Sequence, residues 1–369
     1  MTPEPVSTDI SDSEGVELLR NLLEIPSLSG SEATAVDQLI GWLAAHGCQA
    51  YRDGAGNAVG VLAAGGAEPA REIILLGHID TVPGHPPVSI HDGRLYGRGA
   101  VDAKGPLAAF AVAAARVGVR QGWRIVVVGA VEEEAATSKG ARHIARERSP
   151  ELAIIGEPTG WQRVALGYKG RLLADLTIRR PMSHRAGPVP SASELAVTFW
   201  NDVQTRLLEI NASRERAWDQ VLANLRGFAS SDDGLYETAH LSLGFRLPLD
   251  YSPERLKALL LELKDGARLD FHGDEQAFRS DKNNVLVRAF LAAVREHGGD
   301  PGFVVKTGTS DMNVVGPVWR CPILAYGPGD SSLDHTPEEH VALEEWTRGV
   351  SVLTQVLRDL TTPDRPARI

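Results

Sequence analysis

The sequence Gly-His-Ile-Asp-Thr-Val-Pro at residues 77–83 is the stretch that decides the fold and the chemistry of this chain. It directly follows the apolar run Ile-Ile-Leu-Leu at residues 73–76, which predicts a buried strand. His78 then stands where that strand ends, and open α/β sheets carry their chemistry at the carboxyl ends of strands. A histidine there, with Asp80 two residues on, is typical of a metal ligand whose ring a carboxylate orients. An ordinary turn histidine fits this stretch alone equally well.

Three more apolar runs lead into residue types that bind metals. Continuous apolar strands are what a parallel sheet buried on both faces requires, so we expect a mainly parallel α/β sheet. Histidine and carboxylate side chains at the ends of such strands suit a divalent ion such as zinc. The runs are residues 125–128 before Glu132, Glu133 and Glu134, residues 152–155 before Glu157, and residues 322–326 before a loop that reaches His335. A further candidate, Asp102, stands just before a predicted helix.

Each of these residues also has a plainer interpretation. Three consecutive glutamates are typical of a solvated helix start, where the helix dipole favours carboxylates. His335 alone would suit a polar surface position, and Glu157 before Pro158 would suit a turn. Chance agreement of all the candidates at strand ends is much less expected than any single coincidence. The sequence therefore predicts a metal site.

Composition narrows the class of protein. The 369 residues are enough for two domains of ordinary size. A net charge of −10, without a basic stripe interleaved with aromatics, argues against nucleic acid as a partner. No run approaches the roughly 20 apolar residues of a membrane span, and residues 1–13 lack the apolar core of a signal peptide. Cys48 and Cys321 give no disulfide framework, so we expect a cytoplasmic protein that does not act at a membrane.

The pattern changes between about residues 167 and 281. Apolar alternation predicts strands there at residues 172–178 and 240–247, and helical periodicity appears near residues 191–212 and 253–264. Strands with helices on one side indicate an α+β domain. We therefore expect a catalytic domain made of residues 1–166 and 282–369, with residues 167–281 inserted into it.

Two helix starts are predicted in the catalytic domain. Pro106 suits the first position of an Ala-rich helix that continues to about Arg116. Thr-Pro-Glu-Glu at residues 336–339 has the form of a capping box, which predicts that the last helix begins there and continues to about Leu360.

Taken together, these motifs resemble the dinuclear zinc aminoacylase and dipeptidase family, which includes acetylornithine deacetylase and succinyl-diaminopimelate desuccinylase. The resemblance covers essentially the whole chain in the family's order. It implies that Asp80 orients His78, that Glu133 is the general base, and that a cis peptide bond follows Asp102. Two zinc ions, or cobalt in their place, would be bound by His78, Asp102 as the bridging ligand, Glu134, Glu157 and His335.

The same resemblance implies a homodimer. The inserted domain would be the dimerisation and lid domain, and His184 from the neighbouring subunit would stabilise the oxyanion of the reaction. On the sequence alone, an exposed loop histidine explains His184 better.

A closer resemblance, at residues 167–171 and 306–313, is to the lysine-releasing enzymes of lysine and arginine biosynthesis. It implies an amide hydrolase that releases lysine, or ornithine, from the C-terminal glutamate of an acidic amino-group carrier protein. Arg246 would bind the substrate carboxylate with its planar guanidinium, although a surface salt bridge explains it equally well. Gly308, Thr309 and Ser310 would also contact the substrate.

Other functions stay open. Within the class, the alternatives are an N-acetyl-lysine or N-acetylornithine deacetylase and a dipeptidase. A catalytically inactive binding module would require a lost ligand or base, and none is missing. A non-metal α/β hydrolase would need a Gly-x-Ser-x-Gly elbow between strand and helix, which we do not find.

An acidic carrier requires a local basic surface on an enzyme that is itself acidic. Basic side chains near the start of the inserted domain are the candidates, although such residues commonly only keep strand edges soluble. They are Lys169, Arg171, Arg179, Arg180 and Arg185.

Overall fold

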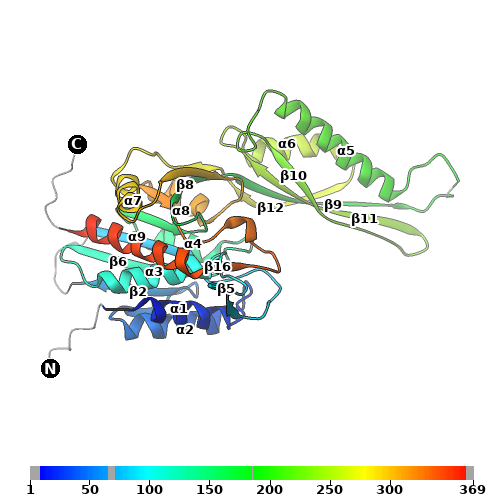
Figure 1. Ribbon diagram of the computed structural model, residues 1–369. Helices are drawn as coiled ribbons and strands as arrows, with labels where there is room; N and C mark the ends of the chain where they lie inside the picture. The colour runs from blue at the N-terminus through cyan, green and yellow to red at the C-terminus, as the bar shows by residue number, and fades with distance from the viewer. Residues whose placement is uncertain (1–8, 65–70, 185, 363–369) are drawn as a thin grey trace. The chain divides into compact units, whose positions relative to one another are not determined.

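The computed structural model of the protein describes residues 9–64, 71–184 and 186–362. The chain divides into two compact units (Figure 1). Unit 1 comprises Met1–Gly167, Ser280–Val304 and Ser310–Ile369, and unit 2 comprises Tyr168–Arg279 and Val305–Thr309. Unit 2 is thus an insertion that also takes one short segment from later in the chain. Among the described residues, no helix combines the length and the hydropathy needed to cross a membrane.

Unit 1 is built on a mixed sheet in the order β1-β2-β6-β3-β7-β15-β8. Its four central strands, β6, β3, β7 and β15, are mutually parallel, and the strands on either side are antiparallel. The prediction of a mainly parallel α/β sheet is therefore confirmed. The bounds are β1 Gln49–Arg52, β2 Ala58–Ala63, β3 Arg71–His78, β6 Trp123–Ala130, β7 Leu152–Gly156, β8 Arg163–Tyr168 and β15 Ile323–Ala325, and β14 (Gly302–Lys306) pairs with β8.

The helices of unit 1 form the core with this sheet. Helix α3 (Lys104–Val117) is buried along almost its whole length, and its alanines let it pack closely on β3. Helices α1 (Asp12–Leu23) and α9 (Leu343–Thr361) pack on α3 in turn. Buried residues of α2 (Ala33–Ala45) and α7 (Val285–Glu296) complete the same cluster. A separate pair, α4 (Lys139–Glu147) and α8 (Asp311–Trp319), contacts β6 and β15.

Both predicted helix starts in unit 1 need correction. Helix α3 begins at Lys104, two residues before Pro106. Proline is tolerated there because the first-turn N–H groups have no partner within the helix. The predicted start of the last helix at residues 336–339 is wrong. Residues His340–Ala342 form β16, which pairs with β5 (Arg94–Tyr96) and through it with β4 (Ser89–His91), and α9 begins only at Leu343.

Unit 2 is an antiparallel sheet with two helices on one face (Figure 1). The strand order is β10-β11-β9-β12, and apolar side chains that alternate along β9 and β11 form the core with α5 and α6. The strands and helices that the sequence predicts here are all present. The bounds are β9 Gly170–Pro181, α5 Ala192–Asn211, β10 Leu222–Asp232, β11 Tyr236–Leu247, α6 Pro253–Leu263, β12 Arg268–Glu275 and β13 Phe278–Arg279.

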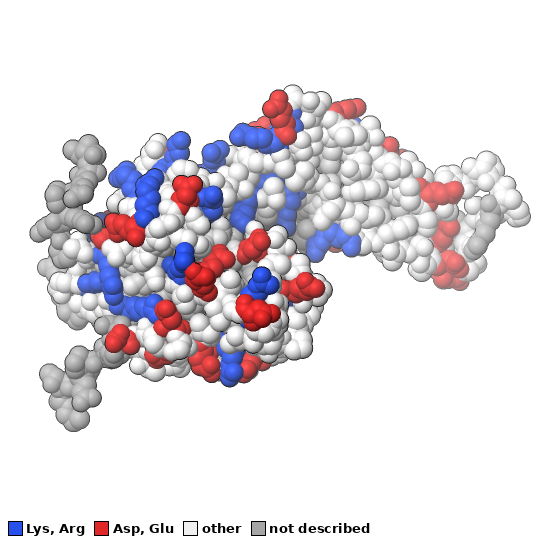
Figure 2. All heavy atoms as spheres, in the orientation of Figure 1, with Lys and Arg blue, Asp and Glu red and all other residues white. Residues whose placement is uncertain are grey.

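The charge of the chain is unevenly shared between the two units. Of the 38 basic and 48 acidic residues, unit 2 holds sixteen of each, so unit 1 carries the whole net charge of −10. On the face drawn in Figure 2, basic and acidic side chains are interspersed over unit 1.

Candidate metal centre

The parallel strands of unit 1 bring the candidate ligands to one edge of the sheet. His78 is the last residue of β3 and lies beside Ala130, the last residue of β6. The three glutamates follow β6 directly, and Glu157 follows β7, the other neighbour of β3. Parallel strands end at the same edge, so these residues meet although they are up to 79 positions apart in the sequence.

The ring of His78 is fixed in one orientation. Its Nδ1 lies 3.0 Å from the backbone oxygen of Asp80, which can only accept a hydrogen bond. Nδ1 therefore carries the hydrogen, and Nε2 faces Asp102 Oδ1 at 3.2 Å. A neutral histidine held in this way presents the Nε2 lone pair to a metal ion.

Asp102 lies between the two histidines. Its Oδ1 faces His78, and its Oδ2 lies 2.9 Å from Nε2 of His335. The same nitrogen of His335 lies 2.9 Å from Oε1 of Glu134. The peptide bond between Asp102 and Ala103 is cis, as the resemblance implied. One carboxylate that reaches ligands on both sides has the arrangement of a bridge between two cations.

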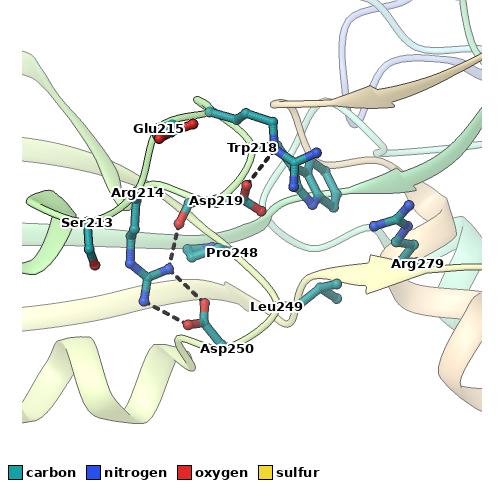
Figure 3. A pocket seen from close by; sticks show the side chains of 10 residues that line it. Ser213, Arg214, Glu215, Trp218, Asp219, Pro248, Leu249, Asp250 and Arg279 are labelled. Carbon is teal, nitrogen blue, oxygen red and sulfur yellow. Dashed lines mark hydrogen bonds and ion pairs between the residues drawn. The ribbon is translucent and has the colours of Figure 1, made fainter.

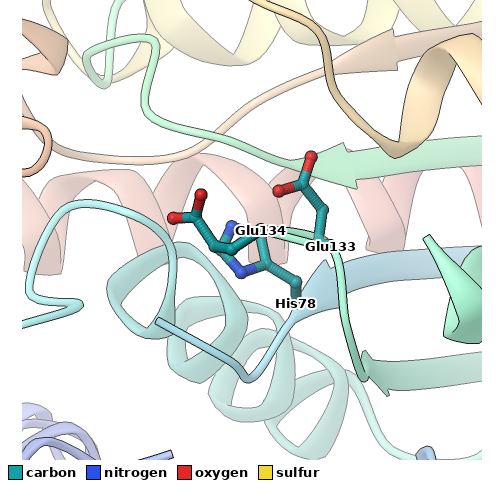
Figure 4. Close-up of side chains that lie close together, drawn as sticks. All are labelled: His78, Glu133 and Glu134. Carbon is teal, nitrogen blue, oxygen red and sulfur yellow. The ribbon is translucent and has the colours of Figure 1, made fainter. Parts of the chain in front are cut away.

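Two overlapping groups of side chains could each hold an ion. The ligand atoms of His78, Glu133 and Glu134 lie within 4.8 Å of one another, as do those of Asp102, Glu134 and His335. Figure 4 shows the first group gathered just beyond the ends of their strands. Glu157 belongs to neither group, but its carboxylate is close enough to Glu133 and Asp102 for their charges to raise its pKa.

The first glutamate of the triplet has a different environment. The backbone of Glu132 is left-handed, with φ of 59°. Its side chain accepts a hydrogen bond of 2.7 Å from the hydroxyl of Thr137 and pairs with Lys139 at 3.4 Å. Glu132 is therefore engaged outside the cluster, and Glu133 and Glu134 are the two that enter it.

Asp80 contacts both His78 and the segment that carries Glu133 and Glu134. It is fully buried, and its two carboxylate oxygens accept the backbone N–H groups of Glu133 and Glu134, each at 3.1 Å. The hydroxyl of Ser29, which lies in no recognisable sequence motif, donates a third bond of 2.7 Å. Burial opposes ionisation of Asp80, but these bonds and His78 outweigh it and lower its pKa. An ionised Asp80 thus holds His78, Glu133 and Glu134 in fixed positions relative to one another.

The electrostatics of the cluster fit a cation. Burial raises the pKa of both Glu133 and Glu157 well above the ordinary value, and neighbouring carboxylates raise it further. Hydrogen bonds to Asp102 and Glu134 raise the pKa of His335 to about 10. Burial and mutual repulsion thus favour protonation of Glu133 and Glu157, and a bound cation would instead stabilise their charged forms. Imidazole nitrogens and carboxylate oxygens are the donors that zinc prefers, so these residues fit divalent metal ions.

The remaining predicted site residues lie elsewhere in the fold. His184 is exposed in unit 2, in the loop between β9 and α5, and its Nδ1 accepts the N–H of Ala186. Arg246 and Thr309 come together within unit 2, where Nη1 of the arginine donates to the threonine hydroxyl at 2.8 Å. Gly308 precedes that threonine, and Ser310 caps α8 in unit 1.

The predicted basic docking surface is wrong in part. Lys169 is fully buried, and its Nζ donates to the backbone oxygens of Ala217 and Gln220. A buried amine cannot attract a partner protein. Of the other members, Arg171 is half-buried, Arg179 and Arg180 pair with Asp233 and Glu237, and Arg185 lies outside the described residues.

Unit 2 also contains a hollow of about 700 Å³ (Figure 3). Arg214 lines it and makes a two-pronged ion pair with Asp250, at 2.8 and 2.7 Å. Arg216, also in the lining, pairs with Asp219 at 2.8 Å. Because these two guanidinium groups already have carboxylate partners, the hollow is a weaker candidate for a ligand site than the cluster in unit 1.

Comparisons with known proteins agree with the geometry. Residues 74–359 match the model of peptidase family M20/M25/M40. A LysW-lysine hydrolase of Deinococcus radiodurans is 44% identical, over 98% of this chain and 99% of that protein. A LysW-lysine/LysW-ornithine hydrolase of Sulfurisphaera tokodaii is 32% identical, over 74% of this chain and 77% of the other.

Solved structures share the fold at lower identity. A tripeptidase of Staphylococcus aureus has a TM-score of 0.76 at 18% identity, covering 95% of this chain and 99% of that one. A dinuclear metal binding peptidase from the M20 family of Bacillus subtilis has a TM-score of 0.66 at 12% identity, covering 95% and 98%. With a family match across most of the chain and a relative at 44% identity over nearly all of it, the chain belongs to peptidase family M20/M25/M40.

Proposed function

We propose that this protein hydrolyses the amide bond that joins the α-amino group of lysine to the C-terminal glutamate of a LysW-type carrier protein. Ornithine is a second leaving amine to be tested. The observation that carries the proposal is the 44% identity, over nearly the full length of both chains, to a protein named LysW-lysine hydrolase. The cluster of His78, Asp102, Glu134 and His335 supplies a site suited to that chemistry. The two free cysteines fit a reducing compartment, and we place the reaction in the cytoplasm.

His78, Asp102, Glu134, Glu157 and His335 would hold two zinc ions, or cobalt, in each subunit. Such ions, when bound, polarise an amide carbonyl and make a water molecule acidic enough to attack it near neutral pH. Asp102 faces both histidines and would keep the two sides of the site at a fixed spacing.

Glu133 is the proposed general base. Its pKa is raised by burial and by neighbouring carboxylates, so it can accept a proton from the attacking water and pass it to the departing amine. Its backbone N–H is held by Asp80, which keeps the side chain directed into the cluster. Asp80 acts through this contact and through the ring of His78.

We assign substrate recognition to Arg246 and to residues 308–310. Arg246 carries a planar guanidinium, a group that can bind a carboxylate. Thr309 positions it by accepting a hydrogen bond from Nη1 at 2.8 Å, while its own hydroxyl donates to the backbone oxygen of Lys169 at 3.1 Å. Gly308 and Ser310 flank this threonine; the backbone N–H of Ser310 already donates to Oδ1 of Asn313 at 3.0 Å, so Ser310 would contact the substrate with its hydroxyl. His184 lies exposed on unit 2 and would stabilise the oxyanion at the site of a neighbouring subunit.

A homodimer would form along the β10 edge of the unit 2 sheet. Strand β10 is an edge strand whose residues are almost all exposed, including Leu225 (42%) and Phe228 (47%). An exposed apolar edge strand is prone to pair with another chain. Pairing with a second β10 would bury part of these side chains. It would also bring His184 closer to the neighbouring subunit.

The test is a direct comparison of substrates. Purified protein loaded with zinc is given carrier-linked lysine, carrier-linked ornithine, N-acetyl-lysine, N-acetylornithine and a plain dipeptide, and free amino acid is measured. We expect kcat/KM for carrier-linked lysine to exceed that for each small substrate. Faster release from an N-acetyl amino acid or a dipeptide would assign the chain to that reaction instead.

A further inference from the structure

Glu339 is a buried carboxylate with no assigned part in the chemistry. Its side chain is inaccessible to solvent, yet it lies in unit 1 next to the metal cluster. Oε1 accepts three backbone N–H groups, from Gly99 at 2.9 Å, Val101 at 2.9 Å and Asp102 at 3.1 Å. Oε2 accepts Nη1 of Arg98 at 2.6 Å. Both oxygens thus accept hydrogen bonds from a single loop, residues 97–102, which ends at the proposed bridging ligand Asp102.

The pairing of two short strands puts Glu339 in this place. It directly precedes β16, whose first residue His340 pairs with Tyr96 at the end of β5. The backbone oxygen of Glu339 extends that ladder by accepting the N–H of Gly97 at 3.1 Å. The side chain therefore emerges beside the loop at the point where β5 ends and the loop begins.

The loop has two backbone hydrogen bonds of its own, from the N–H of Ala100 to the oxygen of Gly97 at 3.1 Å and from the N–H of Gly105 to the oxygen of Gly99 at 3.0 Å, and neither uses the N–H groups that Glu339 accepts. Gly97 and Gly99 have positive φ angles of 155° and 90°, so the backbone turns sharply and its N–H groups converge. Converging N–H groups form a concave site for an anion. A side chain on Gly99 would meet Lys104 and Thr81 at 3.1 Å, so the turn is also tightly packed. One buried carboxylate satisfies three donors that would otherwise remain unpaired.

Glu339 also belongs to the segment that carries the last ligand. His335 is four residues earlier, and its backbone is left-handed with φ of 61°. Arg98 anchors the other side, because its Nε donates to the backbone oxygen of Gly84 at 3.1 Å while Nη1 bonds Glu339. The carboxylate thus joins the segment that bears Asp102 to the segment that bears His335.

We propose that Glu339 is a positioning residue for the metal centre, which fixes Asp102 relative to His335 and thereby sets the geometry of the site for divalent cations. The proposal rests on the proposed metal-dependent function and deepens it. Residues that hold metal ligands typically change metal affinity by about 10- to 100-fold when they are replaced. Glu339→Gln keeps the size of the side chain but loses its charge, and its NH₂ group can only face the loop donors or Arg98. We expect a loss of metal affinity in that range.

The experiment uses the full-length protein, stripped of metal and titrated with Co²⁺ alone. Affinity is measured by competition with a chelator, and the visible absorption spectrum of the bound cobalt reports its coordination. The matched control is Glu338→Gln, the same change at the adjacent, exposed residue. We expect Glu339→Gln to bind Co²⁺ about 10- to 100-fold more weakly with an altered spectrum, and Glu338→Gln to match the parent in both.

A purely structural role predicts a different result. If Glu339 only stabilised the fold, Glu339→Gln would melt at a lower temperature while its folded fraction bound Co²⁺ with parental affinity and spectrum, and the proposal would be overturned. If Glu339→Gln does not fold, Arg98→Lys takes its place, because it leaves the three backbone bonds intact but removes the guanidinium fork. It should weaken Co²⁺ binding and shift the spectrum, and parental behaviour would overturn the proposal.

The proposed function is scored separately. Release of lysine from the carrier is assayed on the parent protein only. The positioning role is tested by Co²⁺ binding to the variants in the absence of substrate. If the parent protein binds Co²⁺ but releases no lysine, the proposed function is wrong. The role of Glu339 would still be decided by the Co²⁺ affinities and spectra of the variants.

Discussion

Replacing Glu133 by glutamine tests the chemistry most sharply. The substitution keeps the volume of the side chain and its backbone contact to Asp80, but removes the group that accepts the proton. A positioned general base contributes about 10²- to 10⁴-fold, which corresponds to about 2.7–5.4 kcal/mol of transition-state stabilisation. We expect kcat for lysine release to fall by that factor. KM should stay nearly constant, because the base acts only in the transition state.

The metal content of the variant proteins shows whether Glu133 acts as a base or as a metal ligand. If Glu133 is the base and does not bind the metal, its replacement should leave the metal in place, whereas replacement of a ligand should release it. Glu134→Gln should lose metal, because Glu134 belongs to both candidate groups and contacts His335 at 2.9 Å. Glu132→Gln is the matched control, since Glu132 bonds Thr137 and Lys139 instead.

The three variants are compared by steady-state kinetics on carrier-linked lysine and by metal analysis after exhaustive dialysis. We expect a metal-replete, inactive Glu133→Gln, a metal-depleted Glu134→Gln and a nearly normal Glu132→Gln. A Glu133→Gln protein that loses metal would make Glu133 a ligand. An inactive Glu132→Gln beside an active Glu133→Gln would move the base by one residue and refute the assignment.

Further predictions follow from charge and packing. The pKa of His335 is about 10 without metal, so zinc must displace its proton; uptake at pH 7 should acidify an unbuffered solution, and zinc affinity should rise with pH up to about 10. Gly140→Ala should destabilise the protein by about 1–3 kcal/mol in urea unfolding, because the new Cβ would lie 2.3 Å from Asn57 Oδ1. Gly41→Ala, in α2 with nothing within 4 Å, should instead stabilise it by about 0.5–1 kcal/mol. Phe228→Asp should convert a dimer to monomers in light scattering, with loss of lysine release; unchanged mass would exclude the β10 interface.

The sequence predicted the part of the fold in which burial is complete. Strands β3, β6 and β7 are continuous apolar runs because both of their faces are covered, and such runs are recognisable without any partner. Strand β10 was not predicted, since its sequence does not alternate and almost every residue is exposed. Its conformation comes from pairing with β11, which is a contact between chain segments and leaves no periodic signal.

Glu339 shows how a local rule can fail. Thr-Pro-Glu-Glu matches the pattern of a helix start, but the glutamate bonds to a loop about 240 residues earlier. A capping box and a carboxylate that binds a concave backbone both require the same residue type, because both satisfy unpaired N–H groups. The sequence indicates that Glu339 accepts hydrogen bonds, and only the β16–β5 pairing determines which donors it meets.

The glutamate triplet shows the same limit of sequence reasoning at the candidate metal centre. Glu132, Glu133 and Glu134 are identical in type and adjacent, so no property of the side chain distinguishes those that enter the cluster from the one that does not. The backbone makes the distinction, because the left-handed turn at Glu132 directs its carboxylate to Thr137. Asp80 then binds the next two N–H groups and keeps both side chains in the cluster. Which of these glutamates enter the cluster thus depends on one backbone angle and one buried carboxylate, and both act only in the folded chain.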